Sequence, residues 1–97
     1  YNVYPRMVEE AIYLHSAVSE VTVIGIKDEY RGESPKAFVK LKPGESLNET
    51  DLKQFLEDKL SKIEMPSHIE FRDELPKTII GKLSKKELVA EEQAQQA

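Results

Sequence analysis

Cysteine and long apolar runs are both absent from this 97-residue sequence. Without cysteine, the chain can form no disulfide, no thiolate nucleophile and no cysteine metal site, which suits a reducing cytoplasm, the localisation that we expect. Apolar runs such as Val23-Ile24 are far shorter than the roughly 20 residues of a membrane-spanning helix, so no transmembrane segment is expected. The formal net charge is −4, with lysines and glutamates interspersed, which argues against binding to nucleic acid.

Groups that could build a self-contained active site are also scarce. The two histidines, His15 and His68, are far apart and lack the spacing of a metal-ligand pair; we expect His15 at a helix end and His68 at the surface. The four glycines are scattered, so no glycine-rich phosphate loop is present. We therefore expect no metal site and no cofactor bound by this domain alone, and we expect the isolated chain to be inactive.

The pattern of apolar residues predicts one small domain. Helical spacing or β-type alternation predicts, in order, a helix at 5–14, strands at 18–26 and 36–41, a helix at 48–62, a strand at 69–71, a loop at 73–82 and a last short helix from 84. This order predicts an α+β fold with a small antiparallel sheet and helices packed against it. Residues 1–90 would form the domain, and the polar residues 91–97 a flexible tail.

Two of the predicted helices have capping signals at their starts. Asn48 with Asp51, and Ser84 with Glu87, have the spacing of a capping box. Such side chains bind the first backbone N–H groups of a helix, which have no partner within the helix. These pairs therefore predict where the second and third helices begin.

The segment from Leu75 to Leu83 is the strongest candidate for a chemical role. It is a loop with two lysines, Lys77 and Lys82, one glycine and two adjacent isoleucines. A lysine that follows a flexible glycine, as Lys82 follows Gly81, can reach into a partner's cleft, and its compact ammonium suits phosphate oxygens. A solvated lysine in front of a helix is the alternative, and the residue types alone favour it.

The same segment carries a family resemblance. Leu75-Pro76-Lys77-Thr78-Ile79-Ile80-Gly81-Lys82-Leu83 resembles the C-terminal catalytic-lysine motif of the superfamily of acyl-CoA synthetases, peptide-synthetase adenylation domains and luciferases. The start, Tyr1-Asn2-Val3-Tyr4-Pro5 with Val8-Glu9-Glu10, is similar to that family's G-Y-N-V-x-P-x-E-V-E-E segment. Further matches are Val18-x-Glu20-x-x-Val23-Ile24-Gly25 and Lys36-Ala37-Phe38-Val39. The resemblance spans Tyr1 to about Leu88 and is closest to bacterial medium- or long-chain fatty-acid CoA ligases.

The resemblance implies the C-terminal lid domain of an AMP-forming acyl-CoA ligase of fatty acid metabolism. Because the chain opens without methionine, we expect an N-terminal domain and a hinge upstream, the domain binding ATP, Mg²⁺ and a carboxylic acid, by resemblance a fatty acid. Lys82 would be the catalytic lysine of acyl-adenylate formation, and Gly81 would give its loop flexibility. The domain would then rotate, so that Tyr1 and Asn2 line the tunnel for the thiol of CoA. The motif also implies acetylation of Lys82 by a lysine acetyltransferase.

Several residues depart from the family pattern. Met7 stands where the family usually has glutamate, and Lys85 and Lys86 replace an arginine pair. Glu64 takes the place of a common lysine and would repel a CoA phosphate. A second possibility is therefore an adenylation enzyme that loads a carrier protein, and a third is a stand-alone interaction module without catalysis. The resemblance does not identify the acyl substrate.

Overall fold

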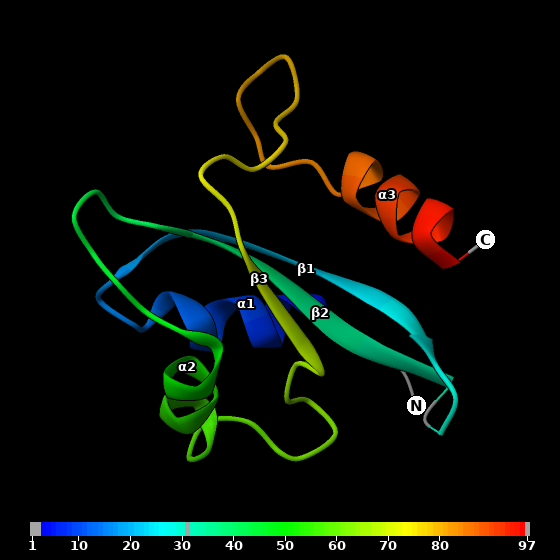
Figure 1. Ribbon diagram of the computed structural model, residues 1–97, viewed down its shortest axis with the longest axis horizontal. Helices are drawn as coiled ribbons and strands as arrows, with labels where there is room; N and C mark the ends of the chain where they lie inside the picture. Colours follow the sequence, from blue (N-terminus) through cyan, green and yellow to red (C-terminus); the bar gives the residue numbers. More distant parts are fainter. Residues whose placement is uncertain (1–2, 31, 97) are drawn as a thin grey trace.

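The computed structural model describes residues 3–30 and 32–96, which fold into three helices and three strands. In chain order these are α1 (Pro5–Tyr13), β1 (Val18–Asp28), β2 (Gly32–Leu41), α2 (Glu49–Leu56), β3 (His68–Phe71) and α3 (Lys86–Gln96) (Figure 1). The predicted order of elements and the α+β class are confirmed. Among the described residues, no helix combines the length and the apolar character needed to cross a lipid bilayer.

β1 and β2 form a long antiparallel hairpin at the centre of the fold. Val21 lies opposite Val39, and the pairing continues as far as Asp28 opposite Gly32. The polar residues that we predicted to lie in the connecting loop therefore form the ends of both strands. The hairpin tolerates them because the ends of the two strands are more exposed than the middle.

β3 lies along the other edge of β2 and runs parallel to it, with Ala37 opposite Ile69 and Val39 opposite Phe71. The sequence predicted an antiparallel sheet, whereas the sheet is mixed. The connection through α2 explains the difference, because it returns the chain to the start of β2. Parallel neighbours require a crossover of this kind.

α2 begins where its cap predicts. Asn48 is the N-cap, and its side-chain oxygen accepts a hydrogen bond from the backbone N–H of Asp51 at 2.8 Å. The helix ends at Leu56, before the predicted end near Lys62. The chain then continues in turns, in which the N–H of Leu60 donates to the Leu56 carbonyl at 3.0 Å. Leu60 thereby stays in the apolar core although it lies outside the helix.

Two apolar cores cover the two faces of the sheet. The first is formed with α1 and α2 and contains Val8, Ala11, Ile12, Val18, Val21, Val23, Ala37, Val39, Leu52, Leu56, Leu60 and Ile69. The second is formed with the segment that precedes α3 and with α3 itself, and contains Ile24, Ile26, Phe38, Leu75 and Leu88. Neighbouring residues of a strand point to opposite faces, so β1 and β2 contribute to both cores.

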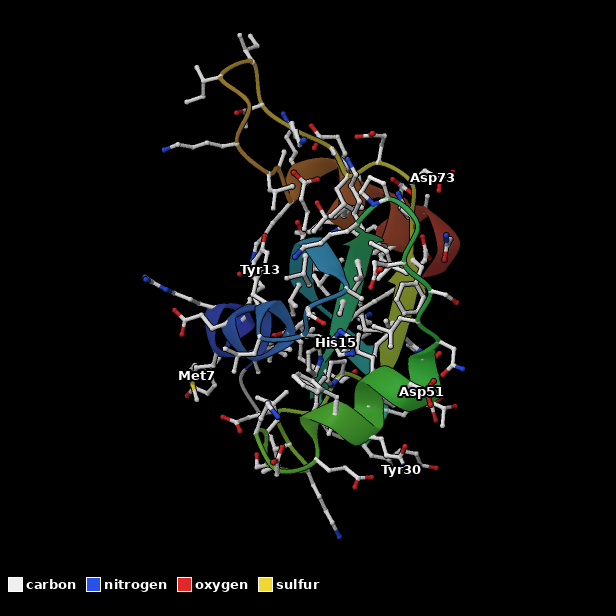
Figure 2. All side chains as sticks on the ribbon, turned by 90° about the vertical axis from the view of Figure 1, so that its left-hand side faces the viewer. Met7, Tyr13, His15, Tyr30, Asp51 and Asp73 are labelled. Atoms are coloured by element: carbon white, nitrogen blue, oxygen red, sulfur yellow. The ribbon has the colours of Figure 1, made fainter. Side chains whose placement is uncertain are left out.

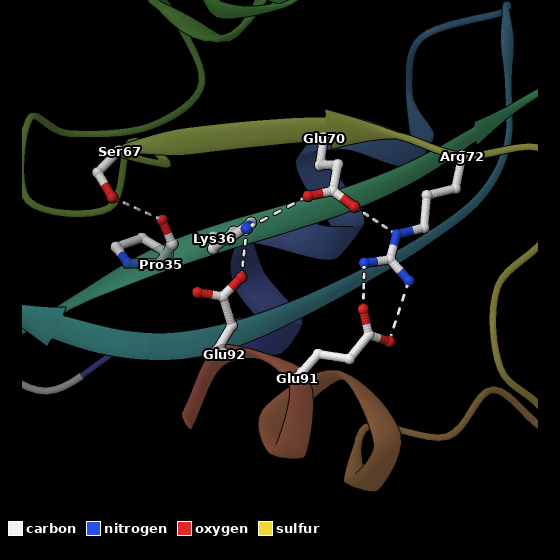
Figure 3. Close-up of polar contacts among 7 residues, drawn as sticks. All are labelled: Pro35, Lys36, Ser67, Glu70, Arg72, Glu91 and Glu92. Carbon is white, nitrogen blue, oxygen red and sulfur yellow. Dashed lines mark hydrogen bonds and ion pairs between the residues drawn. The ribbon is translucent and has the colours of Figure 1, made fainter. Parts of the chain in front are cut away.

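α3 is bound to the second face largely by ion pairs. Glu91 accepts two hydrogen bonds from Arg72 at 2.8 and 3.2 Å, and Glu92 pairs with the buried Lys36 (Figure 3). Glu70 of β3 lies between the two cations, 3.3 Å from the Lys36 Nζ and in contact with Arg72. The sequence predicted a polar tail from residue 91, but the helix continues there because its glutamates have partners on the sheet.

Candidate functional site

Residues 77–85, which we call the lysine arm, form a small hairpin where the sequence predicted a loop. Lys77 and Leu83 form an antiparallel bridge, and the N–H of Thr78 donates to the Lys82 carbonyl at 2.7 Å. In Figure 1 the arm stands away from the sheet and from the helices, at the top of the view. The backbone therefore gives this segment a defined shape and direction.

The turn at the tip of the arm depends on Gly81. Its N–H donates to the Thr78 carbonyl at 2.9 Å, and its φ of 84° lies in the left-handed region that glycine adopts readily. Ile79, Ile80 and Gly81 thus form a three-residue hairpin loop with a left-handed last residue. The Thr78 hydroxyl accepts from the N–H of Lys82 at 3.2 Å. Gly81 supplies the turn geometry, and loop flexibility stays a prediction.

The tip of the arm exposes two large apolar side chains next to Lys82. Ile79 is 104% and Ile80 is 77% exposed, and Lys82 is exposed as well. In the side view the tip extends beyond the rest of the domain (Figure 2). Within the part of the chain that the structure describes, the Lys82 ammonium has no acidic partner. It is therefore available to an anion outside the domain.

A shallow depression beside the arm combines three lysines with apolar side chains. It is lined by Lys77, Thr78, Ile79, Ile80, Lys82, Ser84, Lys86 and Glu87. The single glutamate is engaged, because a hydrogen bond from the Ser84 side chain lowers the pKa of Glu87. The sequence predicted that these two residues cap a helix starting at 84; α3 instead begins at Lys86, and the contact between them joins their side chains. The charges that remain favour an anion next to the arm.

The two ends of the arm are tied to β1 through lysines. At the first end, the Lys77 Nζ lies 3.0 Å from Glu20, and this hydrogen bond raises the pKa of Lys77. At the second end, the Lys85 Nζ donates to the Val23 carbonyl at 2.8 Å and lies 3.1 Å from Glu9 of α1. Lys77 and Lys85 are thus engaged within the domain.

Outside the lysine arm, the sequence drew attention to Tyr1, Asn2 and the two histidines. Tyr1 and Asn2 lie outside the described residues, so their proposed place in a thiol tunnel stays a prediction. His68 is exposed, as expected, while the ring of His15 accepts a hydrogen bond from the N–H of Ala17 at 3.1 Å and packs edge-on against Phe55. Among the described residues, no group of histidine, aspartate and glutamate could hold a metal ion.

Sequence reasoning missed the role of Glu20 and Glu9 beside the arm. The sequence placed Glu20 in a family pattern, and it indicated that Glu9 is a solvated charge at a helix start, whereas the Glu9 side chain is only 19% exposed and pairs with Lys85. One signal was available for Glu20, because glutamate is disfavoured in strands and this one directly precedes the β-branched and apolar run from Val21 to Ile26. Its pairing with Lys77 links positions far apart in the sequence and could not be derived from local patterns.

Residues 7–82 match the family described as AMP-binding enzyme C-terminal domain. The chain is 48% identical over 92 residues to a long-chain-fatty-acid–CoA ligase of Bacillus subtilis (strain 168), covering 95% of this chain and 16% of that protein. It is 45% identical over 80 residues to a crotonobetaine/carnitine–CoA ligase of Salmonella arizonae, covering 82% of this chain and 16% of that protein. The chain thus spans about one sixth of the length of these curated relatives.

The fold comparison agrees with the sequence. The crystal structure of an acyl-CoA synthetase from Brucella canis superimposes with a TM-score of 0.90 at 37% identity. The alignment covers 100% of this chain and 18% of that one. Sequence and fold together show that this chain belongs to the AMP-binding enzyme C-terminal domain family.

Proposed function

We propose that this chain is the catalytic C-terminal domain of an ATP-dependent acyl-CoA ligase and that Lys82 is its lysine for acyl-adenylate formation. The observation that carries the proposal is the geometry of the lysine arm. A hairpin holds Lys82 clear of the domain body, and its ammonium has no acidic partner among the described residues. Lys77 and Lys85, which flank it, are neutralised by carboxylates.

The chemistry of adenylate formation requires such a cation. An anionic carboxylate attacks the α-phosphate of an anionic triphosphate, and pyrophosphate leaves. Negative charge gathers on the oxygens around the phosphorus, where a positioned ammonium stabilises it. It also holds the two reactants together. In this proposal ATP, its Mg²⁺ and the acid are bound mainly by an N-terminal domain, and this domain closes over them.

In the second half-reaction, the acyl group is transferred from the adenylate to the thiol of CoA. After adenylate formation the domain rotates, Lys82 leaves the reaction centre, and the segment near Tyr1 and Asn2 lines the path of the CoA thiol. Transfer to CoA in preference to a carrier protein is supported by the names of the two curated relatives, both CoA ligases. A fatty acid is the acyl substrate that the first of these names supports. Acetylation of Lys82 would remove the charge and block the first step.

Lys82→Ala in the full-length ligase tests the proposal. The rate of acid-dependent pyrophosphate exchange should fall by about 10² to 10³, the usual loss for one electrostatic contact in a transition state. Conversion of synthetic acyl-adenylate and CoA to acyl-CoA should stay near the wild-type rate, because Lys82 takes no part in it. The two half-reactions are measured separately on the same preparation.

The matched control is Lys42→Ala, which removes an exposed lysine from the loop between β2 and α2. It should leave both half-reactions unchanged. Lys77→Ala should be less damaging than Lys82→Ala, because Lys77 is paired with Glu20. Equal slowing of both half-reactions by Lys82→Ala, or a larger loss from Lys77→Ala, would show that Lys82 is not the catalytic lysine.

A further inference from the structure

We propose that Glu20 and Glu9 are positioning residues for adenylate formation, because each ties one end of the lysine arm to the edge strand β1. Glu20 holds the first end through Lys77, and Glu9 holds the second through Lys85. The inference rests on the proposed function of Lys82. It adds to that function two carboxylates that touch no reactant and act only through the direction of the arm.

The surroundings of Glu20 indicate that its carboxylate serves to hold Lys77 of the arm. Its side chain is only 22% exposed, and its Oε2 lies 3.0 Å from the Lys77 Nζ. Its other oxygen, Oε1, is buried and has no hydrogen-bond partner among the described residues. Removing a carboxylate oxygen from water without a partner is unfavourable, and a β-branched residue would suit a strand better. The bond to Lys77 is the interaction that offsets this cost.

Glu9 forms a junction of three elements. Its side chain is 19% exposed, and its Oε2 accepts from the N–H of Val23 at 2.9 Å and lies 3.1 Å from the Lys85 Nζ. Lys85 donates in turn to the carbonyl of Val23 at 2.8 Å. β1 is an edge strand, so both backbone groups of Val23 point to a side that no neighbouring strand covers. Glu9 and Lys85 occupy these groups and fasten the arm to α1 and β1 together.

The arm has one apolar anchor at its base, Leu83 on the second core, so its direction depends further on the two clamps, the Lys77–Glu20 and Lys85–Glu9 contacts. Its tip is exposed, and its backbone hydrogen bonds fix its shape but not its angle to the sheet. A small rotation at the base moves Lys82 at the far end, and a displacement of about 1 Å at a reacting centre can cost about 10²-fold in rate. Because both ends of the arm are attached to β1, the arm cannot rotate freely about its base before the domain closes.

A double-mutant cycle in the full-length ligase tests the first clamp. Glu20→Gln and Lys77→Met should each slow pyrophosphate exchange by about fivefold, the upper range for a partly exposed ion pair. The double variant should be no slower than either single variant, because one interaction is lost in all three. Thioester formation from synthetic acyl-adenylate and CoA should stay within about twofold of wild type, since Lys82 takes no part in that step. Addition of Glu9→Gln should deepen the exchange defect to about 25-fold, because the second clamp is a separate site.

The control is Glu10→Gln, which breaks an exposed ion pair with Arg6 on α1 (3.2 Å) that touches neither clamp. Both half-reactions should keep their wild-type rates. Equal slowing of both half-reactions with a lower melting temperature would assign the pairs to stability alone and overturn the inference, as would losses that multiply in the double variant. If Lys82→Ala slows only adenylate formation but the clamp variants slow both half-reactions, the positioning role of Glu20 and Glu9 is refuted and the proposed function of Lys82 is not. If Lys82→Ala slows both half-reactions equally, the proposed function of Lys82 and the positioning role of the two glutamates are both refuted.

Discussion

Gly81 shows how one backbone conformation at the tip of the arm can carry function. Its φ is 84°, and a Cβ built there would meet no other atom within 4 Å. Steric contact with neighbouring atoms therefore does not exclude a side chain at position 81. The constraint is the left-handed backbone itself, which costs a residue with a side chain about 1–2 kcal/mol.

We predict that Gly81→Ala slows pyrophosphate exchange by about tenfold, because a strain of about 1–2 kcal/mol shifts the turn away from the shape that presents Lys82. The melting temperature should change little, since the exposed tip can rearrange without disturbing either core. Gly44→Ala is the matched control, with a φ of 79° and equally open space in the loop after β2. Equal effects of the two substitutions on exchange would contradict the assignment.

At the scale of elements, α3 is unusual because charge binds it to the sheet. Leu88 is its buried apolar residue, and Glu92 is nearly as well buried. The Lys36 Nζ and the Arg72 guanidinium lie 4.9 and 4.8 Å from the centre of the Phe38 ring. An aromatic face beneath two cations therefore completes the surface on which α3 rests.

This packing explains which elements the sequence could predict. α1, β1, β2 and α2 bury apolar residues at the period of a helix or a strand, so they were found, along with the loop that carries Lys82. The second half of α3 has no apolar stripe, and its ion pairs to Arg72 and Lys36 depend on tertiary contacts. The parallel direction of β3 is likewise set by the crossover and not by the local sequence.

We predict that acid weakens this packing. Burial alone would raise the pKa of Glu70, but hydrogen bonds from Arg72 and Lys36 lower it, and a hydrogen bond from Arg72 lowers that of Glu91. A carboxylate with a lowered folded-state pKa stabilises the fold above its unfolded pKa, about 4.3 for glutamate. That stability is lost as the pH falls through the folded-state value.

The free energy of unfolding in urea should therefore fall between pH 5 and pH 2.5, with these two groups contributing on the order of 1 kcal/mol, since their exposure weakens the pairs. Arg72→Gln should be less stable at neutral pH and should lose less on acidification, because the pairs of Glu70 and Glu91 with Arg72 are already absent while the Lys36–Glu70 pair remains. An unchanged pH dependence in this variant would show that these carboxylates are not responsible.

At the scale of the whole molecule, the domain has its own apolar core, whereas the proposed role of Lys82 requires partners outside the domain. Both faces of the sheet are covered by buried side chains, so the fold does not depend on another domain for its core. The lysine arm, by contrast, offers a cation beside a depression that is only shallow. The sequence has no glycine-rich loop to hold a triphosphate. The relatives are about six times longer, which leaves room for the rest of an active site.

We predict that the 97-residue chain alone folds but does not catalyse adenylate formation. Folding should appear as a cooperative thermal transition in far-ultraviolet circular dichroism, because the two cores are internal to the chain. Acid-dependent pyrophosphate exchange with the purified chain should not exceed the blank, since one positioned cation cannot bind and align both ATP and a carboxylic acid. Exchange above the blank that disappears in the Lys82→Ala chain would contradict this, because it would place a complete adenylation site within these residues. A chain without a cooperative transition would contradict the first half, because the cores would then need the remainder of the enzyme to form.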